Sequence, residues 1–461
     1  MSAEDNAFIA VEEGDVTKLK AALAQDANNL KDSFKSHRNL LHLASELGQN
    51  DCVAFLLENG FDIEAATTDL DGYHPLHLCV RKGHLETTRL LIDKGADFNA
   101  KDKYQATPLH KACRARFIGI IRLLIEKGVD LNIGDNNDWT PLHRACASGD
   151  MDILDVLVEG GCNVEKGDIS GGTAMHIAAD SGRVDAVTYL LSKGANPCIV
   201  DQSGASPLFR ACRRGHQKTV AVLLEADPQA AGLVDNEGRT GLHIAAEEGH
   251  GEVVRELITA SSLPLKIDLV NRAGLTALDS AVEKGQLGVV KILMEDGGAA
   301  LNETGNGTMP TIFRCCKDTG NKVVNQQLLE VLEYLIRSRN ANIRVTNPDG
   351  FMPLHYAAQY GTLEMVQCLV WWGRADPEEP GGKGGRRPAD LALPFRTGIV
   401  KFLESPDQHS PPAAKELEQE GKMGQDQSKN IHDGRNVEGS KSWTARRGNL
   451  GITLSNMCFI S

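Results

Sequence analysis

The sequence lacks several features that mark common functional classes. No apolar run approaches the ~18 residues that a membrane-spanning helix needs, and the first stretch, MSAEDNAFIAVEEGD, has neither the basic flank nor the apolar centre of a signal peptide. Positive charge is not in surplus either, because 49 Lys and Arg stand against 62 Asp and Glu, a net charge of −13. General nucleic-acid binding needs a basic face, so we expect no nucleic-acid partner.

Cysteine is present without a disulfide framework. The chain has 11 cysteines, and their spacing fits a reducing compartment, so we expect a cytoplasmic protein. His110 and Cys113, and likewise His143 and Cys146, are one helical turn apart, but each pair offers only two of the four ligands of a structural zinc site. Outside the repeated pattern described next, no catalytic arrangement is visible. We therefore expect no catalytic residue, no metal and no cofactor.

What the sequence does have is a repeated unit. The stretch Asp102–Asn132 reads DKYQATPLHKACRARFIGIIRLLIEKGVDLN, and similar stretches begin at Asp69 and at Asp135. Thr107 and Thr140, at matching places, are 33 residues apart. A fixed period of this length is typical of a repeat array, in which each unit contacts only its neighbours.

Each unit reads as two short antiparallel helices and a turn. Thr107 can cap a free backbone N–H, and Pro108 suits the first helical turn because its missing N–H would have no partner there. Apolar residues at helical spacing follow in 109–113, and a second apolar run lies in 118–125. Gly128 then ends the second helix. Neither helix can bury its apolar face alone, so the units must stack.

The recurring Thr-Pro-Leu-His of this unit resembles the ankyrin repeat, whose motif is T-P-L-H-x-A on a period of 33. The resemblance implies an all-α repeat solenoid of about 10–12 units, degenerate caps included, each with two helices and a β-hairpin-like turn. It also implies that turn tips and first-helix ends line a concave face that binds proteins. In the family the motif histidine hydrogen-bonds within the turn framework, a role that carries over to His42, His77, His110, His143, His176, His243 and His355.

The pattern divides the chain into four parts. Residues 1–34 form a degenerate N-terminal capping repeat, 35–306 the regular array, and 307–404 divergent repeats with insertions near 317–329 and at the glycine-rich loop 381–385. From 405 to 461 the composition is polar and predicts a disordered tail. One regular unit departs from its siblings, since Arg116 stands where they carry an inter-helix glycine. A positive φ at this residue would carry strain of about 1 kcal/mol.

Basic and aromatic residues recur at the positions that the family uses for binding. The candidate partner-binding residues are Tyr73, Arg81, Lys82, Tyr104, Lys111, Arg114, Trp139, Arg144, Arg210, Arg213 and Arg214. Exposed aromatics flanked by arginine have the composition of an interface hot spot. We predict a basic and aromatic groove over residues 70–216 that binds an acidic or phosphorylated protein segment. The alternative, that these charges form an ordinary solvated face, stays open.

The last four residues, Cys458 to Ser461, fit the C-a-a-X signal for prenylation, and a final serine favours a farnesyl group. With only Arg446 and Arg447 as basic neighbours, one prenyl chain would give weak and reversible membrane association. Chance is the alternative, because many tails carry a cysteine near the end.

The function predicted from these patterns is a monomeric, non-enzymatic scaffold or adaptor that binds partner proteins, cytoplasmic and in part peripheral to a membrane. The rival prediction is a regulatory or targeting subunit of an enzyme complex such as a ubiquitin ligase or a phosphatase. No segment is left for a catalytic domain, because the chain is repeat or polar tail throughout.

Overall fold

The computed structural model describes residues 2–31, 35, 37–260, 266–301, 309–394 and 396–406. The chain divides into two compact units, Met1–Glu404 and Ser405–Ser461. The first contains helices α1 to α23 and two 3-10 helices, and the described residues include two isolated β-bridges but no strand. The tail predicted to be disordered, with Cys458 at its end, lies outside the described residues from 407 onward.

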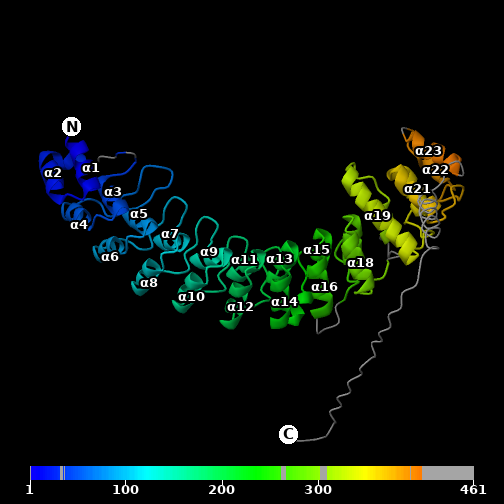
Figure 1. The fold of residues 1–461 in the computed structure, drawn as a ribbon, viewed down its shortest axis with the longest axis horizontal. Coiled ribbons are helices and arrows are strands. Elements are labelled where there is room, and N and C mark those ends of the chain that lie inside the picture. Colours follow the sequence, from blue (N-terminus) through cyan, green and yellow to red (C-terminus); the bar gives the residue numbers. More distant parts are fainter. Residues whose placement is uncertain are drawn as a thin grey trace, which may run out of the picture. The chain divides into compact units, whose positions relative to one another are not determined.

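The helices of the first unit pair in chain order into twelve repeats (Figure 1). The pairs are α1 (Ala3–Glu13) with α2 (Val16–Lys31), α3 (Leu40–Leu47) with α4 (Asn50–Glu58), α5 (Pro75–Lys82) with α6 (Leu85–Asp93), α7 (Pro108–Ala115) with α8 (Ile118–Glu126), α9 (Pro141–Ser148) with α10 (Met151–Glu159), α11 (Ala174–Asp180) with α12 (Val184–Ser192), α13 (Pro207–Arg214) with α14 (Gln217–Ala226), α15 (Gly241–Glu248) with α16 (Gly251–Ala260), α17 (Ala277–Glu283) with α18 (Leu287–Glu295), η2 (Thr311–Cys315) with α19 (Lys322–Arg339), α20 (Pro353–Tyr360) with α21 (Leu363–Trp371), and α22 (Pro388–Leu391) with α23 (Thr397–Glu404). A further 3-10 helix, η1 (Pro228–Gly232), follows α14.

The first helix of a regular repeat begins and ends as the sequence predicts. In α7, Thr107 has an extended backbone and Pro108 opens the helix. The helix ends at Arg116, whose φ is +62°, whereas Gly83 ends α5 with φ +86°. Arg116 therefore adopts the left-handed conformation that its glycine siblings adopt, with the strain of about 1 kcal/mol that a side chain brings there.

The core runs along the repeats. Leu109 and Ala112 of α7 and Leu124 of α8 are fully buried, together with their counterparts in the other repeats. Helix α7 packs on α5 and α9, and α8 packs on α6 and α10. Each repeat therefore buries its apolar faces against the next repeat, as a solenoid requires.

The divergent repeats depart from the pattern in two ways. The first helix at Thr311–Cys315 is only a short 3-10 helix, while its partner α19 has 18 residues, so the predicted insertion partly lengthens the second helix. The expectation that the loop 381–385 interrupts the array is wrong. Gly382 N–H donates to the Gly350 carbonyl at 2.9 Å, the same bond that Lys103 N–H makes to Asp71 at 3.0 Å, so this loop forms the turn of the last repeat.

Candidate protein-docking face

The turns that project from the first helices are held by the motif histidines. In α7, the backbone N–H of Thr107 donates to His110 Nδ1 at 3.1 Å, and the Thr107 hydroxyl lies 2.9 Å from the same nitrogen. Since Nδ1 accepts, Nε2 carries the proton, and it donates to the Trp139 carbonyl in the next turn at 2.9 Å. The predicted role in the turn framework is confirmed, and the structure adds that each bond joins two neighbouring repeats. The same bond forms at His42, His77, His143, His176, His243 and His355.

Four repeats carry another residue in place of this histidine, namely Phe209, Asp279, Arg314 and Asp390. Asp279 accepts the Thr311 hydroxyl at 2.7 Å and lies 3.4 Å from the Arg314 guanidinium, so an ion pair takes the place of the imidazole. Phe209 instead packs with Ala205 and Ile244 in a small apolar cluster. The joint between α13 and α15 is therefore apolar where its neighbours are polar.

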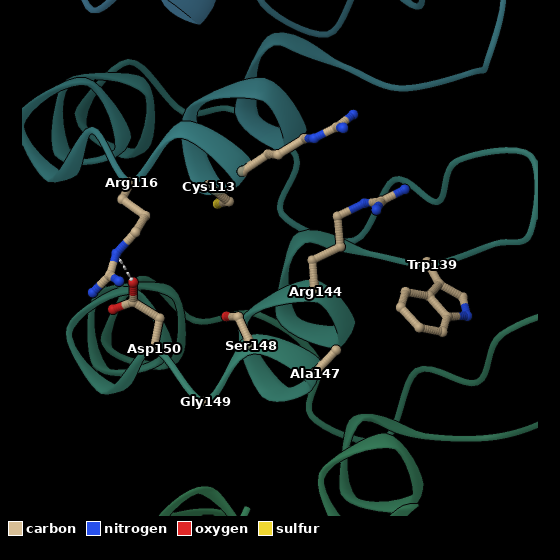
Figure 2. A pocket seen from close by; sticks show the side chains of 9 residues that line it. Cys113, Arg116, Trp139, Arg144, Ala147, Ser148, Gly149 and Asp150 are labelled. Atoms are coloured by element: carbon tan, nitrogen blue, oxygen red, sulfur yellow. Dashed lines mark ion pairs between the residues drawn. The ribbon is translucent and has the colours of Figure 1, made fainter. Parts of the chain in front are cut away.

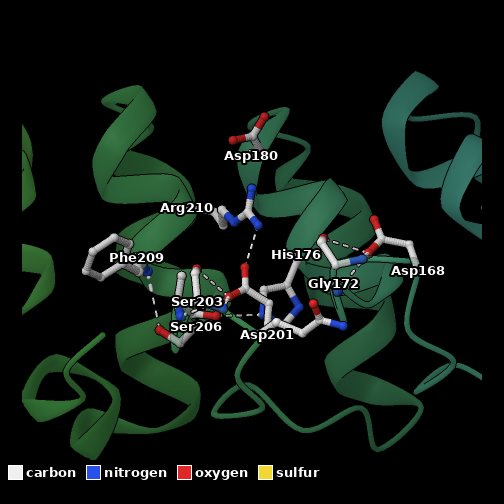
Figure 3. Close-up of polar contacts among 12 residues, drawn as sticks. Asp168, Gly172, His176, Asp180, Asp201, Ser203, Ser206, Phe209 and Arg210 are labelled. Atoms are coloured by element: carbon white, nitrogen blue, oxygen red, sulfur yellow. Dashed lines mark hydrogen bonds and ion pairs between the residues drawn. The ribbon is translucent and has the colours of Figure 1, made fainter. Parts of the chain in front are cut away.

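An aspartate rigidifies the tip of each regular turn. Asp201 Oδ1 accepts the backbone N–H groups of Ser203 at 2.8 Å and Ala205 at 3.1 Å, as Figure 3 shows. Asp102 accepts those of Tyr104 and Ala106 in the same way, at 2.8 and 2.9 Å. The turn is thus pre-formed, and its second carboxylate oxygen is left to find another partner.

In three turns, the partner of this second carboxylate oxygen is one of the predicted binding residues. Lys111 Nζ lies 2.5 Å from Asp102 Oδ2, and Lys111 is only 8% exposed. Arg144 pairs with Asp135, and Arg210 pairs with Asp201 (Figure 3). Each of these cations neutralises the carboxylate of its own turn, so a partner would have to compete with that carboxylate. A constant spacing of nine residues between tip aspartate and cation is the sequence signal that identifies the pair.

Other predicted cations pair across repeats. Arg81 and Lys82 at the end of α5 lie 3.2 and 3.5 Å from the Glu46 carboxylate at the end of α3. Arg214 lies 3.1 Å from Asp180 at the end of α11. Much of the predicted basic groove is therefore a set of neutralised pairs on neighbouring first helices.

The predicted aromatics differ in exposure. Tyr73 is only 9% exposed and is covered by Arg81 and Lys111, whose cationic groups lie 4.9 and 4.8 Å from its ring centre. The expectation of an exposed ring is wrong here, because cation–π contacts close over it. Tyr104 is 48% exposed. Trp139 is half-buried, with its indole N–H 3.2 Å from Asp168 and the Arg144 guanidinium 5.9 Å from its ring.

Two predicted cations remain available. Arg114 is exposed and Arg213 is half-buried, and within the described ranges neither forms an ion pair. Arg213 lies over the Phe209 ring at 5.7 Å. Arg114 borders a hollow of about 580 Å³ between the ends of α7 and α9 (Figure 2). The hollow is lined by Cys113, Arg114, Arg116, Trp139, Arg144, Ala147, Ser148, Gly149 and Asp150.

The hollow owes its depth to small residues on α9. Ala147 stands where α7 carries Arg114 and α13 carries Arg213, and Ser148 stands where α13 carries Arg214. At one end of the hollow Arg116 Nε lies 2.5 Å from Asp150 Oδ2, and at the other end lies Trp139 (Figure 2). Burial raises the pKa of the Cys113 thiol, so the thiol stays protonated and unreactive. Cys113 therefore contributes an apolar surface at the bottom of the hollow.

Comparison with known proteins agrees with this architecture. Family models for ankyrin repeats match residues 7–102, 100–168, 161–231 and 227–304 in three-copy form, and 327–370 in many-copy form. The chain therefore belongs to the ankyrin repeat family, whose repeats mediate protein–protein interaction, and the predicted solenoid is confirmed.

Several curated proteins are similar to parts of the chain. They include the tyrosine-protein kinase HTK16 of Hydra vulgaris (29% identical over 36% of this chain), the nuclear factor NF-kappa-B p105 subunit of Gallus gallus (29% over 32%) and Rabankyrin-5 of Homo sapiens (28% over 34%). The aligned stretches cover 21%, 14% and 13% of those proteins' own lengths. None of the described helices is both long and apolar enough to cross a membrane.

Proposed function

We propose that this ankyrin array is a non-enzymatic scaffold that binds a partner protein at the hollow between α7 and α9. The observation that carries the proposal is Arg114, an exposed guanidinium without an ion-pair partner in the described part of the chain, at the edge of a concavity that contains Trp139. Most of the predicted cations on the same face are paired with a carboxylate. An unpaired arginine beside a half-buried aromatic is typical of an interface hot spot.

The partner segment that fits this face is acidic. Arg114 and Arg213 supply positive charge without an ion-pair partner in the described part of the chain. The cations Lys111, Arg144, Arg210 and Arg214 are already neutralised by aspartates. A carboxylate on the partner would form a charge-assisted bond with Arg114 at little cost in desolvation, because the arginine is exposed. A phosphorylated segment would use the same arginines and is an outcome that the test below distinguishes.

The test uses the full chain and a fluorescein-labelled peptide, Gly-Asp-Glu-Glu-Asp-Tyr-Asp-Glu-Glu-Asp-Gly, with binding followed by fluorescence anisotropy. Arg114→Glu with Arg213→Glu should weaken binding by about tenfold or more, because two attractive charges become repulsive. The matched control is Arg122→Glu with Lys218→Glu, which makes the same change of charge at exposed positions of α8 and α14. Equal loss in both variants would mean that only net charge matters, and no loss in the first would refute the docking face. A version with phosphoserine for the acidic residues reports whether phosphate is preferred.

The absence of enzymatic activity is part of the proposal. Every described α-helix belongs to a repeat. Both ring nitrogens of His110 are engaged, Nδ1 at the start of its own helix and Nε2 at the carbonyl of the next turn. Turnover by the purified chain against any substrate would contradict this part.

We also propose that the protein acts as a cytoplasmic monomer that a farnesyl group on Cys458 ties weakly to membranes. The support is the C-a-a-X sequence alone. In cells that contain farnesyltransferase, the chain should gain the mass of one farnesyl group, and part of it should sediment with membranes. Cys458→Ser should abolish both, whereas Cys162→Ser, at a half-buried cysteine of the array, should change neither. An unmodified wild-type chain would refute the anchor.

A further inference from the structure

Most neighbouring first helices are joined by a side chain that covers the glycine between the two helices of the preceding repeat. A Cβ atom built on Gly48 would lie 2.6 Å from the ring of His84 in the next repeat. The corresponding distance is 2.7 Å both from Gly182 to His216 and from Gly215 to His250. A ring therefore lies directly on the glycine, and this close approach, besides the positive φ, excludes any larger residue there.

Each of these histidine rings also donates a hydrogen bond to a backbone carbonyl at the end of the preceding first helix. His84 Nε2 bonds to the Glu46 carbonyl at 2.9 Å, in the last turn of α3. His216 and His250 make the same bond to the carbonyls of Asp180 and Arg213, each at 3.0 Å. The last carbonyls of a helix have no partner within the helix, so a donor from the next repeat closes the joint.

The joint between α7 and α9 is built differently. Arg116 has a side chain where the siblings have glycine, and the facing residue is Asp150 in place of a ring. The shorter Asp150 leaves room for the Arg116 side chain and pairs with it at 2.5 Å, although without the alignment of a hydrogen bond. A carboxylate cannot donate to the Arg114 carbonyl, and within the described residues no hydrogen bond to this carbonyl is recorded. The hollow thus opens at the place that the ring of His84, His216 or His250 fills in three other joints.

We propose that this hollow receives an aromatic side chain with its own hydrogen-bond donor, tyrosine or tryptophan, from the acidic partner segment. The inference rests on the proposed function and names the residue that anchors it. The volume of about 580 Å³ admits such a side chain. Cys113 and Ala147 supply apolar contacts, the Arg114 guanidinium can lie over the ring face, and the donor finds the Arg114 carbonyl or the Asp150 carboxylate.

The first test compares partner chemistry on the wild-type chain. The acidic peptide described above contains one tyrosine, and a second peptide carries alanine in its place. We expect the tyrosine peptide to bind about tenfold more tightly or better, with a change in Trp139 fluorescence that is lost in Trp139→Phe. Equal affinities would overturn the inference while leaving acidic recognition intact, and binding of neither peptide would overturn both proposals.

The second test fills the hollow with a histidine ring introduced by substitution, as in the joints at His84, His216 and His250. Arg116→Gly with Asp150→His restores the sibling pattern at this joint, so the preference for tyrosine over alanine should vanish while residual acidic binding through Arg114 remains. Gln286→His places the same ring over Gly249, far along the chain, and should leave the preference unchanged. Ala147→Phe, at a half-buried position of α9 that lines the hollow, fills it independently. It replaces the double variant if circular dichroism shows that the double variant does not fold. A preference retained in a folded filled variant would overturn the inference.

Discussion

At the scale of single residues, two departures from the repeat consensus are each accompanied by a compensating change in a neighbour. Arg116 adopts the left-handed conformation that costs a non-glycine residue about 1 kcal/mol, and it is accommodated because Asp150 is short and oppositely charged. Asp279 in place of histidine is accompanied by Arg314 in the next repeat. Such pairs could be suspected from the sequence only by aligning the repeats and comparing positions that face one another.

The start of the first helix offers a paired prediction. Thr107→Val removes the hydroxyl that lies 2.9 Å from His110 Nδ1, and should cost about 1–2 kcal/mol of unfolding free energy. Met352 occupies the matching position in α20, where His355 Nδ1 is buried without a hydrogen-bond partner in the described structure. Met352→Thr supplies the hydroxyl and should stabilise the protein by about 0.5–1.5 kcal/mol.

Urea unfolding of the two variants measures these changes. Because the substitutions add and remove the same hydroxyl at equivalent positions, they control for each other. Stabilisation by Thr107→Val, or destabilisation by Met352→Thr, would mean that the hydroxyl does not serve the histidine as described.

At the scale of elements, the sequence predicted the helices well, because period, cap and glycine all act within one repeat. Thr107, Pro108 and the apolar residues after them specify α7 without reference to the rest of the chain. The loop 381–385 was misjudged because its glycines suggested an insertion, whereas its place is fixed by a backbone bond to the preceding turn. Bonds between repeats do not show in the local pattern.

The docking face was harder to predict for the same reason. Sequence position identified the cations correctly as residues of first-helix ends, but their availability depends on the neighbouring turn or helix. Lys111 forms an ion pair with Asp102 of its own turn, and Arg81 forms one with Glu46 of the repeat before it. Arg114 has no ion-pair partner in the described structure because the matching positions of the adjacent first helices carry Arg81 and Ala147, neither of which is acidic. The small side chains of Ala147 and Ser148 line the hollow beside it.

At the scale of the whole array, the histidines give stability a common dependence on pH. Burial lowers the pKa of His42 and His110 to about 4 and that of His77 to about 3, against an ordinary value of 6.5. It also lowers the pKa values of His143, His176, His243 and His355. Protonation would put a hydrogen on Nδ1, which must accept the backbone N–H of the helix start. Every joint that contains a motif histidine is thus sensitive to protonation of that histidine.

The sign of the effect follows from which state binds the proton first. The unfolded histidines titrate near pH 6.5. Burial lowers the pKa of every folded motif histidine below that value, and to about 4 for His42 and His110, so the unfolded chain takes up more protons as the pH falls below 6.5. Unfolding free energy is therefore fully present above pH 6.5 and falls as pH drops toward 4, by about 1.4 kcal/mol per pH unit for each such histidine. At pH 5, His42, His77 and His110 should each cost about 2 kcal/mol.

We expect the urea midpoint of the full chain to be constant between pH 7 and 8.5 and to fall steeply between about pH 6.5 and 5, before aspartates such as Asp201, whose pKa lies below its ordinary value of 3.8, begin to titrate. Because repeats interact only with neighbours, the loss should begin in the histidine-linked repeats. The joint at Phe209 has no titrating histidine. The rate of backbone hydrogen exchange in α13 should therefore change least as the pH falls. An equal midpoint at pH 5 and pH 7.5 would show that the histidines are not held neutral by the joints between repeats.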